Sequence, residues 1–522
     1  MAGFVAKHAE HVIGTLSGFD RLVFRGTLRM LAHRGGMMTY LSAAEVLLKH
    51  FDAHARALTE QLKDASTALA RRLGRPVKYL ASAASNKEEI ARAIAEADGI
   101  TRGLICVLAA VEPCLTYAVV RDRANRRIEL EPRWRKCLFH YHYQVHPRFG
   151  FMHARIQTWF PFAIQVCLNG REWLARSMDA AGLAYQRRDN CFTWLQQPER
   201  AQRMMERQLH SDWPVLLDAI ARSLNPMHTT MFADFPMEYY WSTYQSEWAT
   251  DIMFRDPAVL SRLYPRLVQH GLTTFLSTDV MRFLGRKVLA GERLPPRFAA
   301  EVTSDVKHRP EGVRIKHRVG DNSVKMYDKQ GSVLRVETTI NDVDQFKTFR
   351  PPENQPDADP SWQRMRKGVA DLHRRAEVSQ ACNERYLTAI AATEDTTALG
   401  ELTARLCRPV TYKGRRVRAI NPHAPADSAL LAAISRGEFT LNGLRNQDLR
   451  GLLFAKPGRT KTEQKRQAAA ISRKLRLLRA HHLIRKVPRT HRYHLTDAGR
   501  TIVTALMAAR NANTQELTKM AA

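Results

Sequence analysis

The chain has 522 residues, 44% of them hydrophobic and 8% aromatic, so it is long enough to form several domains with buried cores. Its 81 Lys and Arg against 51 Asp and Glu give a formal net charge of +30, which favours a nucleic-acid partner over a merely solvated basic surface or an anionic membrane. The sequence has no P-loop, dinucleotide fingerprint, zinc-protease helix or serine nucleophile elbow, which disfavours nucleotide-driven and proteolytic functions.

The cysteines and the apolar segments indicate in which cellular compartment the protein is expected. Seven cysteines, most of them in apolar runs and none in a C-x-x-C pair, predict reduced core residues rather than disulfides or a zinc site. No apolar stretch approaches the ~20 residues that cross a bilayer, and the first residues mix charged and apolar side chains, unlike a signal peptide. We therefore expect a cytoplasmic protein without a membrane partner.

Helix-like and strand-like patterns alternate along the chain and predict an α+β fold, with an antiparallel sheet core, packed helices and a helical insert. Helical spacing predicts long helices over 40–72 and 239–254, and a capping pattern begins another at 87. The expected regions are a helical N-terminal region (1–100), an antiparallel β meander with a helix (101–195), a helical region (196–297), a β-hairpin segment that completes the core (298–349), a helix and basic linker (350–425), and a C-terminal domain (426–511).

The C-terminal domain has the most distinctive pattern. Residues 401–522 hold more than half of the positive charge excess, and the order helix, helix, basic helix, basic hairpin, helix is that of a winged-helix domain. The stretch 476–500 also resembles the end of bacterial MarR-type regulators. This resemblance implies that the third helix, 460–482, enters a major groove of DNA and that the hairpin flanks it. A protein-docking module is the alternative.

Two basic segments supply candidate nucleic-acid contacts. On the third helix and the hairpin of the C-terminal domain we expect contacts to base edges and phosphates from Ser472, Arg473, Arg476, Arg479, Lys486, Arg489 and Arg492. In the sheet core, a basic strand with Arg314, Lys316 and Arg318 is either a solvated face or the floor of a nucleic-acid channel.

The most chemically suggestive stretch is a predicted hairpin over 323–340. Side chains alternate between the two faces of a strand. A tyrosine, two lysines, an arginine and a carboxylate are therefore expected to converge on one face, namely Tyr327, Lys325, Lys329, Arg335 and Glu337. Asp328 points the other way unless a bulge turns it. The alternative is a salt-bridged hairpin that grips a nucleic-acid backbone without cutting it.

The string Y-D-K followed by R-x-E in this hairpin resembles the signature of replication initiators from rolling-circle plasmids and filamentous phages. The resemblance implies a DNA-nicking site in which Tyr327 is the nucleophile and Glu337 and Asp328 hold Mg²⁺ or Mn²⁺. Where that family has a further acidic residue after the motif, this chain has Gln330 and Gly331.

A second group of residues extends the same hypothesis. His140 and His142 alternate on a predicted strand, so that both imidazoles share one face, as two ligands of one metal ion do. Tyr240, Tyr244 and Glu247 follow on a predicted helix face. The order resembles two-tyrosine nicking enzymes of the His-hydrophobic-His class, and implies His142 and Glu247 as further metal ligands. Ordinary sheet and core packing is the alternative.

Together these patterns predict a nucleic-acid-binding protein of a mobile or extrachromosomal element that nicks or transfers DNA strands with a divalent metal. The alternative is a non-catalytic winged-helix protein that binds DNA or structured RNA, as a regulator or an RNA partner. A covalent protein–DNA adduct separates the two, because only the first forms one.

Overall fold

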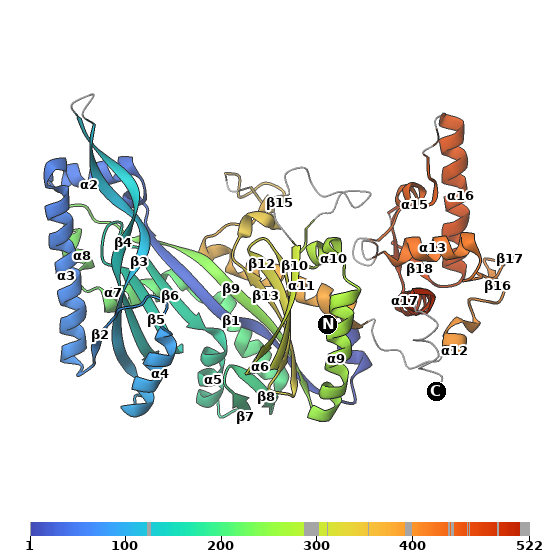
Figure 1. Cartoon of the computed structure of the whole chain (residues 1–522), viewed down its shortest axis with the longest axis horizontal. Helices are drawn as coiled ribbons and strands as arrows, with labels where there is room; N and C mark the ends of the chain where they lie inside the picture. Colours follow the sequence, from blue (N-terminus) through green and yellow to red (C-terminus); the bar gives the residue numbers. More distant parts are fainter. Residues whose placement is uncertain are drawn as a thin grey trace. The chain divides into compact units, whose positions relative to one another are not determined.

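The structure is a computed structural model that describes residues 2–122, 127–286, 302–310, 312–352, 354–391, 399–436, 439, 443–456, 458, 460–487 and 490–511 (Figure 1). The chain forms two compact units. Unit 1 consists of Met1–Ile13, Phe254–Val336 and Ala381–Ala522, and unit 2 consists of Gly14–Met253 and Glu337–Gln380. Both units mix helices and strands, which confirms the expected α+β class.

Unit 2 is built on a mixed sheet with the strand order β13-β9-β1-β6-β5-β4-β3-β2, to which β13 contributes from Glu337 onward. From β1 to β3 in this order, neighbouring strands pair antiparallel, whereas β2 joins β3 in parallel. The strands are β1 (Val12–Leu28), β2 (Val77–Leu80), β3 (Gly103–Asp122), β4 (Arg127–His146), β5 (Gly150–Gln157), β6 (Ile164–Asn169), β9 (Tyr239–Phe254) and β13 (Val333–Ile340).

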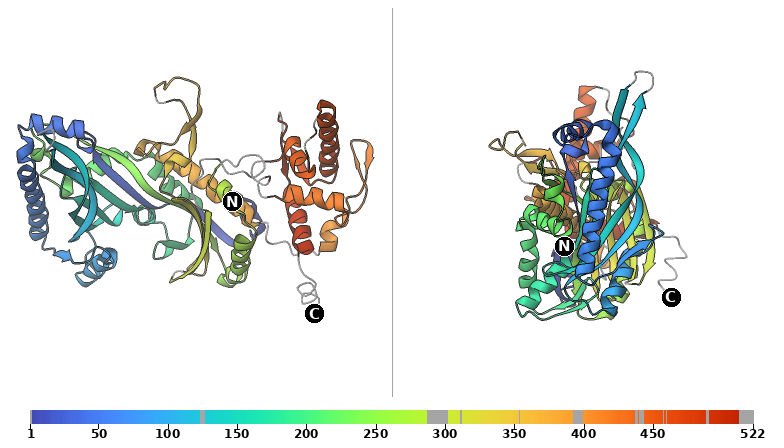
Figure 2. Two further views of the ribbon diagram at one scale, coloured as in Figure 1. Left: turned by 45° about the horizontal axis from the view of Figure 1, so that its top comes forward. Right: turned by 90° about the vertical axis from the view of Figure 1, so that its left-hand side faces the viewer.

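Two hydrophobic cores lie against this sheet. The larger one joins strand residues such as Phe24 and Val166 to the helices α2, α3 and α7, and α2 and α3 (blue) lie beside the strands in Figure 2. The second joins Leu108 and Tyr141 to Ala91 of α4. The remaining elements of unit 2 are α2 (Arg34–Ala43), α3 (Phe51–Arg72), α4 (Lys87–Ala97), α5 (Gly170–Ala180), β7 (Tyr185–Arg188), β8 (Cys191–Leu195), α6 (Pro198–Glu206), α7 (Trp213–Leu224), α8 (His228–Met231), β14 (Lys347–Arg350) and β15 (Ser361–Arg364).

Unit 1 contains a second run of strands, in the order β10-β11-β12-β13. Gln330 and Gly331 both have positive φ and form the turn between β12 and β13, as the sequence predicts. Tyr264 of α9 donates its hydroxyl to the backbone oxygens of Val313, at 2.8 Å, and Met326, at 3.0 Å, and so anchors that helix to the strands. The elements are α1 (Ala2–Lys7), α9 (Pro257–Thr273), α10 (Ser277–Phe283), β10 (Val302–Arg309), β11 (Gly312–Val319), β12 (Asn322–Lys329) and α11 (Leu372–Ile390), which ends in this unit.

The C-terminal part of unit 1 follows the expected order of helices and a short hairpin. Leu430, Leu449, Ile471 and Leu478 are fully buried and belong to one hydrophobic cluster. Thr496 caps the last helix, because its Oγ1 accepts a hydrogen bond from the Gly499 amide at 2.9 Å. The elements are α12 (Leu399–Ala404), β16 (Val410–Tyr412), β17 (Arg415–Val417), α13 (Pro425–Ser435), α15 (Asn446–Leu453), α16 (Lys461–Ala480), β18 (Ile484–Lys486), β19 (Tyr493–Leu495) and α17 (Asp497–Asn511).

Two expectations about local structure are wrong. Residues 12–28, expected within a helical region, form strand β1, because a long run of apolar and β-branched side chains fits a strand covered on both faces. Residues 239–254, expected to be a helix, form strand β9. Residues four apart share a face in a strand as well as in a helix, so this spacing does not separate the two.

Other boundaries shift by a few residues. The helix expected over 40–72 is interrupted, since α2 ends at Ala43 and α3 begins at Phe51. Strands β10 and β15 are not expected from the sequence. Pro113, expected to end a strand, lies inside β3, because β2 pairs only with Val107–Ala110 and leaves the edge beside Pro113 open, where a missing N–H costs little.

Candidate metal centre and basic surfaces

Three carboxylates meet in unit 2, on three strands that are neighbours in its sheet. Asp20 lies on β1, Glu247 on β9 and Glu337 on β13, and one ligand oxygen from each lies within 4.8 Å of the others. Asp20 and Glu337 are buried, with 5% and 3% of their surface exposed, and Glu247 is half-buried. We call these three residues the carboxylate triad.

Packing next to the triad fixes two of the strands that carry it. Phe19 of β1 and Trp248 of β9 contact edge to face, with ring centroids 4.8 Å apart. The Trp248 indole donates to Gln380 Oε1 at 2.8 Å. The Asn190 amide donates to both carboxylate oxygens of Asp20, at 3.0 and 2.8 Å, and so orients that side chain.

Helix α5 begins in contact with β1, the strand that carries Asp20. A Cβ atom at Gly170 would lie 2.1 Å from the Phe19 carbonyl oxygen, so only glycine permits this approach. The next residue, Arg171, is completely buried, and its Nη2 lies 3.2 Å from Asp251 Oδ2 and donates to the Ala249 carbonyl at 3.0 Å. This ion pair joins α5 to β9, the strand that carries Glu247.

The close approach of three carboxylates favours a positive charge near them. Carboxylates this close repel one another when all are ionised, unless a cation or a shared proton offsets the repulsion. The pKa of Arg21 is raised, first by Cys167 and, after an opposing effect of burial, by Glu247. The donors of the triad are all carboxylate oxygens, which hard cations such as Mg²⁺ and Mn²⁺ prefer, so the donor set suits such an ion.

The structure brings together two of the four residues expected to bind metal, Glu247 and Glu337. It adds Asp20, which the sequence reasoning missed because it expected helix over this segment. The signal was present, since Asp20 is the single acidic residue of the 17-residue strand β1.

His142 does not join the triad. It is fully buried on β4, which lies four strand positions from β9, a separation of roughly 19 Å at ~4.8 Å per strand. Its ring lies 6.3 Å from that of His140, so the two share a face as expected. Burial, and secondarily His140, lower the pKa of His142 to about 3, which keeps its imidazole neutral.

In unit 1, β11 and β12 carry a basic face. Arg314 pairs with Tyr327, Lys316 with Lys325 and Arg318 with Ser323 across the two strands, and directly paired residues share a face. Burial lowers the pKa of Lys316, and the positive charges of Lys325, Arg318 and Arg314 lower it further. Cations crowded in this way favour a bound polyanion.

The other residues of the hairpin have distinct surroundings. The ammonium nitrogen of Lys329 lies 6.0 Å from the ring centre of Tyr327, and Arg314 is ion-paired with Asp305 at 2.8 Å. Asp328 lies outside the triad, and burial raises the pKa of its carboxyl group. Burial, and secondarily the charge of Asp328, raise the pKa of Tyr264. Arg335 is buried two residues before Glu337 on β13.

The predicted contacts of the C-terminal domain are mostly at its surface. Ser472, Arg473 and Arg476 are exposed on α16, and Lys486 is exposed on β18. The Asn446 amide donates to Ser472 Oγ at 3.0 Å. Other candidates differ: Arg479 is half-buried with its guanidinium 5.7 Å from the Tyr412 ring centre, Arg492 is half-buried, and Arg489 lies outside the described residues.

Comparison with protein-family models, with curated proteins and with solved structures finds no match to this chain. Within the part of the chain that the structure describes, no helix has the length and apolarity needed to cross a membrane.

Proposed function

We propose that this chain is a nucleic-acid-binding protein of a mobile or extrachromosomal element that cuts or transfers DNA strands with Mg²⁺ or Mn²⁺ held by the carboxylate triad. The observation that carries the proposal is the convergence of Asp20, Glu247 and Glu337 within 4.8 Å in a chain of net charge +30. A basic chain suits a phosphodiester substrate, and buried carboxylates suit the ion that such a substrate needs.

Each part of the chain has a role in this proposal. A bound ion would neutralise the scissile phosphate and stabilise the leaving oxygen. In unit 2, the triad would hold that ion. In unit 1, the exposed Arg318 and the half-buried Lys316 of the basic face would bind a nucleic-acid backbone. Tyr327, in unit 1, remains the proposed nucleophile. Its oxygen would bond to phosphorus, a P–O bond of the strand would break, and the tyrosine proton would pass through water to the leaving oxygen, which becomes the free hydroxyl end of the strand.

The tyrosine is tested by trapping the covalent product. The change Tyr327→Phe is expected to abolish a denaturant-resistant protein–DNA adduct, because phenylalanine has no oxygen to bond to phosphorus. The assay is denaturing electrophoresis with labelled DNA, and Tyr79→Phe, an exposed tyrosine on β2, serves as the control. Cleavage that persists in Tyr327→Phe without an adduct would show that water attacks instead and would remove Tyr327 from the proposal.

DNA recognition is assigned to the C-terminal domain, which we propose is a winged helix with α16 as its recognition helix. The order of its helices and hairpin and the exposed Arg473 and Arg476 on α16 support this. The double change Arg473→Ala and Arg476→Ala is expected to weaken duplex binding about 10- to 100-fold and to lower the salt slope by about 2. Fluorescence anisotropy over a salt series measures both.

The control for this experiment removes the same charge elsewhere. Arg71 and Arg72 are exposed at the end of α3, and changing both to Ala is expected to alter affinity less than about 3-fold. Equal losses in the two double variants would mean that the whole positive field binds DNA and that α16 has no special role.

One observation favours a second candidate, a non-catalytic DNA- or RNA-binding protein. Four charged residues of β12 and β13 are buried, as expected of a sheet stabilised by ion pairs: Lys325, Lys329, Arg335 and Glu337. In that case the purified chain retards DNA or structured RNA but cleaves neither in Mg²⁺ or Mn²⁺.

A further inference from the structure

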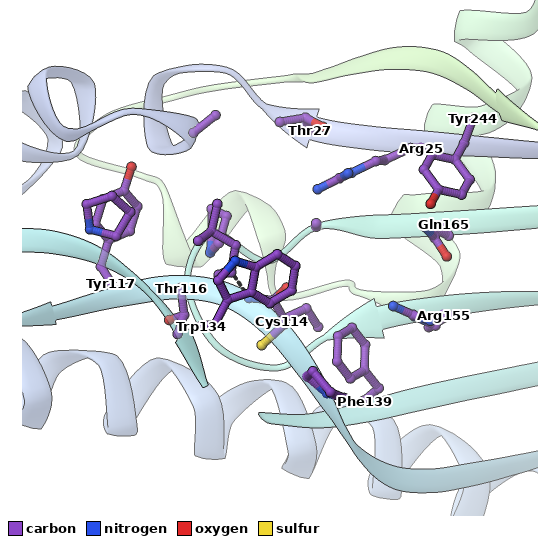
Figure 3. Close-up of a pocket in the computed structure, with 17 residues that line it drawn as sticks. Arg25, Thr27, Cys114, Thr116, Tyr117, Trp134, Phe139, Arg155, Gln165 and Tyr244 are labelled. Atoms are coloured by element: carbon purple, nitrogen blue, oxygen red, sulfur yellow. Dashed lines mark hydrogen bonds between the residues drawn. The ribbon is translucent and has the colours of Figure 1, made fainter. Parts of the chain in front are cut away.

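A pocket of about 250 Å³ opens in unit 2 and is lined by residues of its sheet (Figure 3). Six strands contribute to its lining, which includes Arg25, Thr116, Trp134, Phe139, Gln165 and Tyr244. Pockets for drug-sized ligands measure roughly 300–1,000 Å³, so this one suits a single ring system rather than a larger molecule.

The walls of the pocket offer flat aromatic surfaces to a ligand. Trp134, on β4, is 74% exposed, and Tyr244, on β9, is 54% exposed. Exposed aromatic rings are the usual means by which proteins stack unpaired bases.

The polar groups of the pocket are available to a ligand. Within the described residues, Arg25 forms no ion pair, and the Gln165 amide has no hydrogen-bond partner. Thr116, which is 1% exposed, likewise has no partner for its hydroxyl among the described residues. Figure 3 shows Arg25 extending from β1 into the pocket. Buried polar groups normally find partners, and of these three only Thr116 is buried. Arg25 is exposed and Gln165 is half-buried, so both are open to a ligand with polar edges.

Arg155 also lines the pocket but differs from Arg25, because it is fixed by contacts within the protein. Its guanidinium lies 3.1 Å from Glu112 Oε2 and 4.2 Å from the Phe139 ring centre. Glu112, which also lies 3.3 Å from Lys87, therefore holds Arg155 in the wall of the pocket. Arg25 forms no ion pair among the described residues and can meet a phosphate. Stacking surface, amide edge and cation together match a nucleotide unit of a strand.

We infer that this pocket binds one unpaired base of a single-stranded nucleic acid, stacked on Trp134 with its phosphate at Arg25. The inference rests on the proposed function only in taking nucleic acid as the substrate, and it names the class of substrate as a strand with an unpaired segment. It does not depend on the triad, on metal or on cutting.

The test is equilibrium binding in EDTA, measured by fluorescence anisotropy with a labelled single-stranded DNA, the matching RNA and the DNA duplex. Trp134→Ala is expected to weaken binding of at least one single strand about 10-fold and of the duplex less than 2-fold, because stacking on a ring is lost. Trp134→Phe, which keeps a ring, is expected to retain most of the affinity. Trp194→Ala, on β8, is the matched control and is expected to have no effect.

The comparison of DNA with RNA identifies which strand supplies the base, and either result supports the inference. Competition by free AMP at concentrations equal to those of the oligonucleotide would overturn it in favour of a nucleotide site. Equal losses on duplex and single strand, or no loss with Trp134→Ala while its thermal unfolding is unchanged, would also overturn it. Selective loss in a chain that never cleaves DNA would uphold the inference and defeat the catalytic proposal, and cleavage with unchanged strand binding would do the reverse.

Discussion

Replacing Glu337 with Gln is expected to reduce metal-dependent DNA cleavage by about 100-fold or more and to leave DNA affinity in EDTA within about 2-fold. Glutamine has the same shape but no charge, so it is a poor ligand for Mg²⁺ or Mn²⁺. Asp20→Asn and Glu247→Gln are expected to act alike, because all three carboxylates would share one ion. Cleavage of supercoiled plasmid in Mn²⁺, with EDTA as the blank, measures the effect.

Thermal unfolding provides a readout that does not depend on activity. Millimolar Mg²⁺ or Mn²⁺ is expected to raise the unfolding midpoint of the wild-type chain and not that of Glu337→Gln, because an ion that binds only the folded state stabilises it.

The matched control is Glu377→Gln, on an exposed position of α11 in the same unit. It removes the same charge and is expected to change neither cleavage nor the response of the unfolding midpoint to metal. A Glu337→Gln chain that cuts DNA at the wild-type rate, or a wild-type midpoint that ignores both ions, would rule out the carboxylate triad as the metal site.

Residues 12–28 and 239–254 were both expected to be helical, and one physical reason explains both errors. The same reason explains why Asp20 was not expected in the site. Both segments are strands covered on both sides for much of their length, so they lack the strict alternation of apolar and polar residues that marks a half-exposed strand. The strands β11 and β12 have clearer patterns, and the sequence predicts their bounds to within one residue. The long strands β3 and β4 are predicted only as shorter strands with breaks, one of them at Pro113.

Glu247 and Glu337 were expected as metal ligands from short motifs, whereas Asp20 has no motif around it. Its contribution depends on strand order, because β1 and β13 are far apart in sequence and become close only through β9 between them. No local pattern encodes such an order. The same strand order separates His142 from the triad, although the alternation of His140 and His142 was read correctly.

The buried ion pair between Arg171 and Asp251 leads to the largest expected effect on stability. Arg171→Ala is expected to lower the free energy of unfolding by about 3–5 kcal/mol, because Asp251 would keep its charge in a site with no solvent exposure. Urea titration followed by tryptophan fluorescence measures it. Arg222→Ala, which breaks the exposed Arg222–Glu238 pair in the same unit, is expected to cost less than about 1 kcal/mol.

A double variant distinguishes the charge from the contact. Arg171→Met with Asp251→Leu removes both charges and keeps apolar volume, and it is expected to recover most of the stability lost in Arg171→Ala. The hydrogen bond from Arg171 to the Ala249 carbonyl is lost in both variants, so it cannot account for a recovery. A double variant as unstable as Arg171→Ala would mean that the guanidinium stabilises unit 2 through that hydrogen bond and its packing, with little contribution from the ion pair.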